Sequence, residues 1–200
     1  MKKLLLVVIC GFCLAFVHQS NNVEFESQLQ EFYKNVESLS ANFKQEKHSM
    51  LLLEPLKSEG KFYFKKPDAI RWEETKPQPN YFAINGDIVV RFDGKSKTVS
   101  DNPDMQIKMF KRFILKTIDG SILNDKNFSK QFEDLGETKR FVLLPNQKQL
   151  KKRMAKIELL FNSKTYLLEE LKMFESEEEF TVIQFNGQSA NKELKPELFN

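Results

Sequence analysis

Cysteine and histidine are scarce in this sequence, which holds two of each in 200 residues. Both cysteines, Cys10 and Cys13, fall in an apolar stretch near the start. Of the two histidines, only His48 lies well inside the chain. A zinc site needs several nitrogen or sulfur ligands, and a Ser-His-Asp hydrolase would have to depend on His48 without a G-x-S-x-G turn. We therefore predict no catalytic residue, no metal and no cofactor. A lipid hydrolase that uses His48 remains the enzyme hypothesis to test.

Glycine-rich phosphate loops and strong charge of one sign are also absent. The chain has only seven glycines, and none forms a phosphate-binding motif. Its formal charge is +3, and two of the basic residues, Lys2 and Lys3, belong to a segment that we expect to be removed. Such a balanced charge argues against a nucleic-acid partner.

The N-terminus has the layout of a secretory signal peptide. Three residues with two lysines precede an apolar run over 4–17, and a polar stretch follows over 18–22. This run is too short to cross a bilayer as a stable helix. We predict a signal peptide over 1–20, cleaved near Ala15 or Ser20, and one domain over 21–200. No small residue precedes either cysteine, so no lipid anchor is expected.

Phenylalanine is unusually common, with 19 residues against one tryptophan and four tyrosines. A large core would account for it. The alternative is a cavity lined by rings, which offer broad apolar faces without polar atoms to satisfy.

The stretch over 60–73 has an aromatic face and a charged face. Phe62 and Phe64 alternate with charged or polar residues before Pro67, and Ile70 and Trp72 do so after it. This period of two predicts two antiparallel strands joined by a short turn. Further strands are predicted by the same alternation over 43–50, 81–84, 88–92, 97–100, 131–135, 140–144, 154–161, 166–174 and 180–186.

Two segments have helical spacing instead. Apolar residues recur every three or four positions from Phe25 to Leu39, with Asn22 as a candidate N-cap. A second stripe over 105–118 can start at Asp104 and end at Gly120. It is expected to face inward through Met109, Phe110, Phe113 and Ile114. The stripe predicts a helix that is either a movable lid over a cavity or a permanent part of the core.

The segment Met50–Leu56 is apolar but broken by Pro55, and we interpret it as a connection between strands. Because loops normally lie in water, we expect it either to fold onto the core, which we favour, or to guard an opening.

Taken together, these motifs resemble the periplasmic lipoprotein-carrier family, LolA-like. The resemblance runs from about Phe25 to Phe199. Its landmarks are Phe43-x-Gln45, Gly60-x-Phe62-x-Phe64-x-Lys66-Pro67, Ile70-Arg71-Trp72-Glu73, Pro79, Asn85-Gly86, Thr181-x-Ile183-x-Phe185-x-Gly187, Asn191 and Leu194.

The resemblance implies an incomplete antiparallel β-barrel whose helical lid covers an apolar cavity, a mainly β fold of the α+β class. It implies a soluble periplasmic monomer that takes lipoprotein acyl chains from an inner-membrane lipoprotein-releasing transporter to an outer-membrane acceptor. The cavity residues would be Phe62, Phe64, Ile70, Trp72, Phe82, Ile84, Met109, Phe110, Phe113 and Ile114. Lys66 stands where the family has an arginine that holds the lid closed, so closure here would lack the planar donor fork.

Two related functions stay open at this point. One is a lipid-sensing regulator with the same half-barrel, although such regulators carry a further domain. The other is a dedicated lipid or glycolipid carrier of the same fold.

Overall fold

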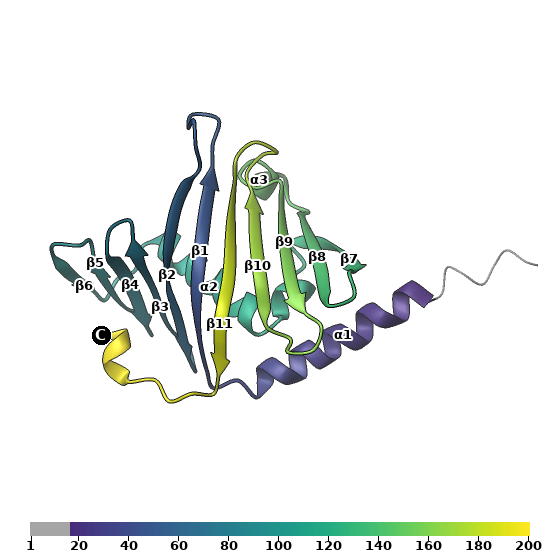
Figure 1. The fold of residues 1–200 in the computed structure, drawn as a ribbon, viewed down its shortest axis with the longest axis horizontal. Coiled ribbons are helices and arrows are strands. Elements are labelled where there is room, and N and C mark those ends of the chain that lie inside the picture. Colours follow the sequence, from purple (N-terminus) through teal and green to yellow (C-terminus); the bar gives the residue numbers. More distant parts are fainter. Residues whose placement is uncertain (1–16) are drawn as a thin grey trace, which may run out of the picture.

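The computed structural model describes residues 17–200 (Figure 1). The predicted signal peptide thus lies, apart from its last residues, outside the described residues, and so do both cysteines. The helices are α1 (Val17–Lys34), α2 (Met105–Ile118), the 3₁₀ helix η1 (Ser121–Asn124), α3 (Lys148–Lys151) and the 3₁₀ helix η2 (Pro196–Phe199). The strands are β1 (Ser38–His48), β2 (Leu56–Lys65), β3 (Ala69–Lys76), β4 (Asn80–Asn85), β5 (Ile88–Phe92), β6 (Lys97–Ser100), β7 (Phe128–Asp134), β8 (Thr138–Pro145), β9 (Lys156–Asn162), β10 (Leu168–Phe174) and β11 (Phe180–Ala190).

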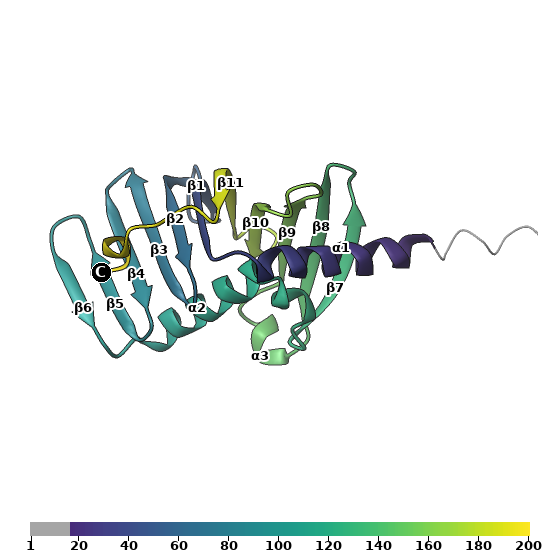
Figure 2. The same cartoon turned by 90° about the horizontal axis from the view of Figure 1, so that it is seen from below.

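All eleven strands form one antiparallel sheet in the order β6-β5-β4-β3-β2-β1-β11-β10-β9-β8-β7. The first and last strands of the chain, β1 and β11, pair at its centre. The end strands β6 and β7 do not pair with each other, so the curved sheet stays open (Figure 2). This confirms the predicted incomplete β-barrel.

Two cross-strand rows of apolar side chains build one wall of the concave face. Phe62, Trp72 and Phe82 stand opposite one another on β2, β3 and β4. Phe64, Ile70 and Ile84 form the next row. The alternation in the sequence predicted this face, because side chains two residues apart on a strand point to the same side.

The concave face is covered by two helices (Figure 2). Helix α1 packs through Phe25, whose ring lies 6.1 Å from that of Phe141 on β8. Helix α2 packs through Phe110, whose ring lies 5.0 Å from that of Phe82. One buried cluster includes residues of both helices and of the sheet, so the core lies between them.

The C-terminal segment packs on the opposite, convex face. Phe199 and Leu194 are buried there with Ala69, against Tyr63. The side chain of Arg71 donates a hydrogen bond to the carbonyl of Leu198. The short η2 helix of this segment shields the outer side of β3 and β4.

Two strands and one helix match their predicted bounds. Strands β5 and β6 have the predicted residues, and Gly86 takes a positive φ of 60° in the turn before β5. Helix α2 spans the predicted residues, and the carboxylate of Asp104 accepts a hydrogen bond from the backbone N–H of Ile107.

The first helix differs from its prediction at both ends. Helix α1 begins at Val17, so Asn22 lies inside it and is not its N-cap. It ends at Lys34, and Leu39 belongs to β1. Leu39 continues the helical spacing only because the inner face of β1 enters the same core that the helix covers.

The preferred interpretation of the apolar connection is wrong. Leu51 and Leu53 in the β1–β2 loop are 92% and 106% exposed, and Leu56 is the first residue of β2 rather than part of a loop folded onto the core. The β1–β2 hairpin is longer than predicted and carries this loop away from the rest of the sheet (Figure 1).

Candidate functional site

Two apolar pockets lie between α2 and the concave face of the sheet. The inner pocket has a volume of about 40 Å³ and includes Leu39, Phe62 and Phe185 in its walls. The outer pocket has a volume of about 270 Å³ and includes Phe82 and Met173. Pockets that hold a small molecule usually measure about 300–1,000 Å³. In this conformation the inner pocket is therefore too small for a ligand, and the outer one approaches a useful size.

The two pockets share one wall, made by Trp72, Ile114 and Leu171. Trp72 comes from β3 and Leu171 from β10, whereas Ile114 comes from α2. A displacement of α2 would thus remove one of the three side chains of this wall.

Trp72 is also the centre of a ring cluster that joins the sheet to α2. Its ring lies 4.3 Å from Phe43, 5.8 Å from Phe62 and 6.1 Å from Phe110. The contact to Phe43 depends on Gly60, which faces Phe43 across the β1–β2 pair. A side chain at position 60 would have its Cβ 2.5 Å from Phe43 Cζ, so glycine makes room for the ring.

The inner face of α2 contributes Phe110, Phe113 and Ile114 to the pockets, as the sequence predicted. Met109 does not follow that prediction. It is 52% exposed and lines neither pocket. Successive residues of a helix point in different directions, and Met109 points toward solvent where Phe110 points inward. Thr117 and Ile118 extend the same face into the inner pocket, although neither was among the predicted cavity residues. The prediction also missed the lining residues of the central strands, such as Leu39, Leu171 and Phe185.

The remaining predicted cavity residues divide into two groups. Phe62, Trp72 and Phe82 line the pockets. The row of Phe64, Ile70 and Ile84 is buried in the sheet wall beside them but lines neither pocket in this conformation. Sequence alternation identifies the face of a strand, but not how far along the strand a hollow extends.

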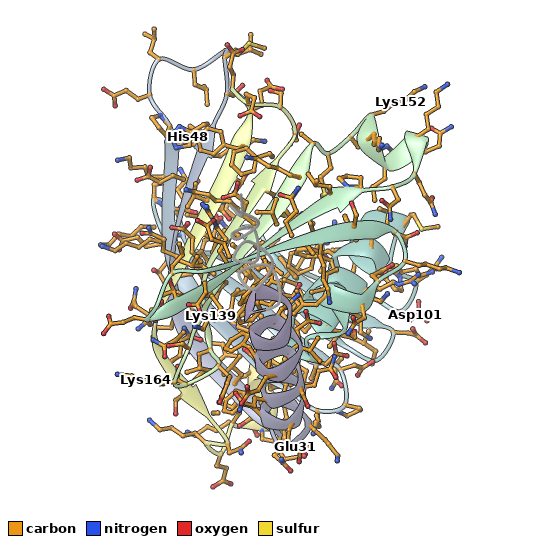
Figure 3. The ribbon with its side chains drawn as sticks, turned by 90° about the vertical axis from the view of Figure 1, so that its right-hand side faces the viewer. Glu31, His48, Asp101, Lys139, Lys152 and Lys164 are labelled. Atoms are coloured by element: carbon orange, nitrogen blue, oxygen red, sulfur yellow. The ribbon has the colours of Figure 1, made fainter. Side chains whose placement is uncertain are left out.

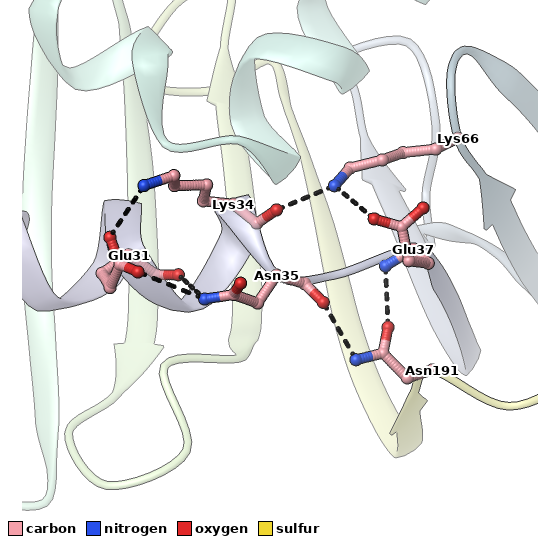
Figure 4. A network of polar contacts seen from close by, with 6 residues as sticks. All are labelled: Glu31, Lys34, Asn35, Glu37, Lys66 and Asn191. Carbon is pink, nitrogen blue, oxygen red and sulfur yellow. Dashed lines mark hydrogen bonds and ion pairs between the residues drawn. The ribbon is translucent and has the colours of Figure 1, made fainter.

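Lys66 connects the β2–β3 turn to the C-terminal end of α1 (Figure 4). Its Nζ donates to the carbonyl of Lys34 at 2.8 Å and to the carboxylate of Glu37 at 2.9 Å. The side-chain amide of Asn191 joins the same network by donating to the carbonyl of Asn35 and accepting from the N–H of Glu37. These bonds fix the junction of α1 and β1. The role predicted for Lys66 in closing a moving lid stays a prediction.

A second ionic contact from this turn reaches α2, and no local pattern in the sequence indicated it. Nζ of Lys111 on α2 lies 2.5 Å from the carboxylate of Asp68 and 2.7 Å from the carbonyl of Gly86. The other oxygen of the Asp68 carboxylate accepts from the N–H of Gly86. The turn thus holds both helices: the side chain of Lys66 binds the end of α1, and that of Asp68 binds α2.

Polar residues are a minority in the walls of the pockets. The outer pocket includes Gln45, Glu74 and Asn80, and the side-chain amide of Asn80 donates to the carboxylate of Glu74 at 2.8 Å. The hydroxyl of Thr117 donates to the carbonyl of Phe113 one helical turn earlier, so it is satisfied within α2. Burial raises the pKa of Tyr33, which keeps its hydroxyl neutral in the wall of the inner pocket. The lining is therefore suited to apolar groups without formal charge.

His48 lies at the far end of β1, away from these pockets. Its ring stacks on Phe180 at 4.2 Å, and its Nε2 is 3.6 Å from the carboxylate of Glu46. Over residues 17–200, no cluster of three or more His, Cys, Asp or Glu side chains is placed to bind a metal. No helix within this range is both long and apolar enough to span a membrane.

Comparisons with known proteins agree with this architecture. The family model described as "Outer membrane lipoprotein carrier protein LolA" matches residues 34–200. A protein of Francisella tularensis subsp. tularensis named "Outer-membrane lipoprotein carrier protein" is 27% identical over 202 residues, covering 100% of this chain and 92% of the relative. The protein of the same name in subspecies novicida matches to the same extent.

Similar solved structures share the fold at low sequence identity. The chain superposes on the structure titled "The complex structure of Pseudomonas aeruginosa MucA/MucB" with a TM-score of 0.57 and 12% identity, over 90% of this chain and 60% of that one. An uncharacterised conserved protein from Thermus thermophilus gives a TM-score of 0.55 and 10% identity, over 89% of this chain and 92% of that one. These likenesses establish the fold alone.

Proposed function

The chain belongs to the LolA family of outer membrane lipoprotein carrier proteins, and we propose that it carries lipoprotein acyl chains in the space beneath α2. The family is one of binding and transport proteins. The proposal extends this to a substrate position, a direction and a mechanism. Lipoproteins would be received at the inner membrane and delivered to the outer membrane across the periplasm.

The observation that carries the proposal is the shared wall of the two pockets. Ile114 of α2 stands between a small inner space and a larger outer one. Both are mainly apolar, and together they run along the concave face from Leu39 to Met173. An acyl chain needs a long apolar channel of this kind, and movement of α2 would create it without unfolding the sheet.

The energetics favour a covered route for such a cargo. Each methylene group taken out of water contributes about 0.8 kcal/mol, so a chain of about sixteen carbons contributes roughly 12 kcal/mol. An acylated protein therefore does not cross an aqueous space unaided at a useful rate. A carrier has to cover the chain and still release it.

The closed position of α2 is held by contacts of moderate strength. The ion pair between Lys111 and Asp68 is partly exposed, with side-chain exposures of 18% and 31%, so about 1 kcal/mol is a reasonable size for it. The contacts of Phe110 with Trp72 and Phe82 bury apolar surface that an acyl chain would bury equally well. Cargo and helix would thus compete for the same surface.

Export fits this role. The predicted signal peptide over 1–20 would take the chain to the periplasm, where residues 21–200 would act as one domain and as a monomer. An inner-membrane lipoprotein-releasing transporter would supply the cargo, and an outer-membrane acceptor would take it. A family of carriers named for the outer membrane supports this setting.

The test uses two glutamates placed on the same helix. Phe113→Glu puts a charge in the outer pocket, whereas Met109→Glu puts it on the exposed face. Each variant is co-expressed with a triacylated lipoprotein and purified, and the bound lipoprotein is quantified. We expect Phe113→Glu to lose most of its cargo and Met109→Glu to retain it. Equal cargo on both variants, with both folded by circular dichroism, would show that the outer pocket does not hold the acyl chains.

A further inference from the structure

The β1–β2 hairpin ends in a loop that exposes its apolar side chains. In the apolar tip, defined as Met50–Leu56, the exposed fractions are 66% for Met50, 92% for Leu51, 106% for Leu53 and 58% for Leu56. Loops in water are normally polar, and clustered apolar side chains mark a contact with a protein or a membrane.

The apolar tip is held outward by its own hydrogen bonds. The N–H of Leu52 donates to the carbonyl of Ser49 at 3.0 Å, which closes a turn. The hydroxyl of Ser49 donates to the carboxylate of Glu179 in the neighbouring β10–β11 turn at 3.3 Å. The loop therefore has a defined conformation in which its leucines face away from the core.

The apolar tip lies at the end toward which the pockets widen. The small inner pocket reaches Leu39 and Gln188, near the start of β1 and the end of β11. The outer pocket reaches Gln45 and Ile183, which pair across β1 and β11 nearer the hairpin end. The loop begins four residues after Gln45, or about 13 Å along the strand. Cargo leaving the outer pocket in this direction would emerge beside the apolar tip.

Charges of both signs lie at the hairpin end of the molecule. The β10–β11 turn is acidic, through Glu175, Glu177, Glu178 and Glu179. The residues at and after α3, which lies at the same end of the molecule, are basic: Lys148, Lys151, Lys152 and Arg153. Figure 3 shows Lys152 and His48 at this end, with Glu31 and Lys164 at the other. Opposite charges at the same end of the molecule give no strong net attraction to a charged surface, so apolar contact has to supply the binding.

We propose that the apolar tip inserts into the interfacial layer of a phospholipid bilayer, so that this carrier meets the membrane directly when it exchanges cargo. A projecting group of leucines suits a bilayer, which yields around it, better than it suits a rigid partner surface. The purpose of this contact depends on the proposed carrier function. The contact itself does not, and it can be measured without cargo.

The experiment measures flotation of the purified chain with vesicles of phosphatidylethanolamine and phosphatidylglycerol, at low and high salt. The variant Leu51→Ser/Leu53→Ser removes the two most exposed leucines. The matched control is Leu135→Ser, a leucine 46% exposed at the β7–β8 turn, which lies at the opposite end of the strands. None of these changes touches the core. Cargo bound after co-expression is measured on the same variants.

We expect the wild type and Leu135→Ser to float with vesicles at both salt concentrations, and the double variant to bind more weakly by a factor of about ten or more. Its bound cargo should be unchanged. The proposal is overturned if the wild type does not float, if the double variant floats equally well, or if high salt abolishes flotation. A dimer that the double variant dissociates, without vesicle binding, would identify a second copy as the occupant and overturn it too. Vesicle binding without any cargo would contradict the carrier function and leave this proposal standing.

Discussion

The ammonium group of Lys111 lies 2.5 Å from the carboxylate of Asp68, which joins the middle of α2 to the β2–β3 turn. Lys66, two residues before Asp68, binds the end of α1. One short turn therefore holds the two helices that cover the concave face, through separate side chains. This separation makes the two attachments testable one at a time.

Asp68→Asn should loosen α2 and leave α1 unchanged. The loss of about 1 kcal/mol from the ion pair should raise amide hydrogen exchange in residues 105–118 about fivefold. Hydrogen exchange with mass spectrometry measures it. The control is Glu133→Gln, which breaks the partly exposed pair with Arg140 on β8. Unchanged exchange in α2 for Asp68→Asn would show that this ion pair does not hold the helix.

Lys66→Met should have the reciprocal effect. It removes the donor to the carbonyl of Lys34 and to Glu37, so exchange should rise at the end of α1 while α2 stays protected. Lys66→Arg should largely restore protection, since a guanidinium can reach the same acceptors. If Lys66→Met instead exposes α2, then Lys66 does act on the cover of the pockets, as the resemblance to the family predicts.

Gly60→Ala should destabilise the whole domain. The new Cβ would clash with the carbonyl of Glu73 and lie 2.5 Å from Phe43, so the ring has to move away from Trp72. Overpacking of this kind costs about 1–3 kcal/mol, which corresponds to a melting temperature lower by roughly 2–12 °C. Lys61→Ala, at the next and exposed position, should change it little. A melting temperature equal to that of the wild type would contradict the tight approach of β2 to Phe43.

Acid should weaken the attachment of α2 to the segment after η1. Burial alone raises the pKa of Asp125, but hydrogen bonds from Lys116 and from the N–H of Asn127 outweigh it and hold the pKa below its usual value. A carboxylate with a lowered pKa in the folded state stabilises the fold above its unfolded pKa, and the effect is lost as pH falls through the folded pKa.

The corresponding variant is Asp125→Asn. Its free energy of unfolding in urea should be lower than that of the wild type at pH 7, and the difference should shrink below about pH 4. A difference that stays constant between about pH 7 and pH 3 would mean that the charge of Asp125 does not contribute.

The sequence predicted the elements whose signals are local. Helix α2 has a capping aspartate and a regular apolar stripe, and β5 and β6 follow glycine turns, so their bounds were found to the residue. Leu39 was assigned to the wrong element because its spacing fits both a helix and the inner face of a strand. The direction of the apolar tip depends on the length of the hairpin that carries it, which no residue within the loop encodes.

Pairs distant in the sequence account for most of what was missed at the site. Asp68 and Lys111 are 43 residues apart and are both ordinary surface residue types, so only the fold identifies them as partners. The inner face of the sheet was predictable from alternation. Which of its rows border open space was not, because that depends on where α2 crosses the strands.

The binding of acyl chains beneath α2 is most directly tested by the fluorescence of Trp72, the single tryptophan of the chain and a wall of both pockets. The protein is loaded with a lipoprotein whose acyl chains carry bromine, and its emission is compared with that of the complex with unbrominated chains. We expect strong quenching by the brominated chains alone. Equal emission from the two complexes, with equal amounts of bound lipoprotein, would contradict a cargo site against Trp72.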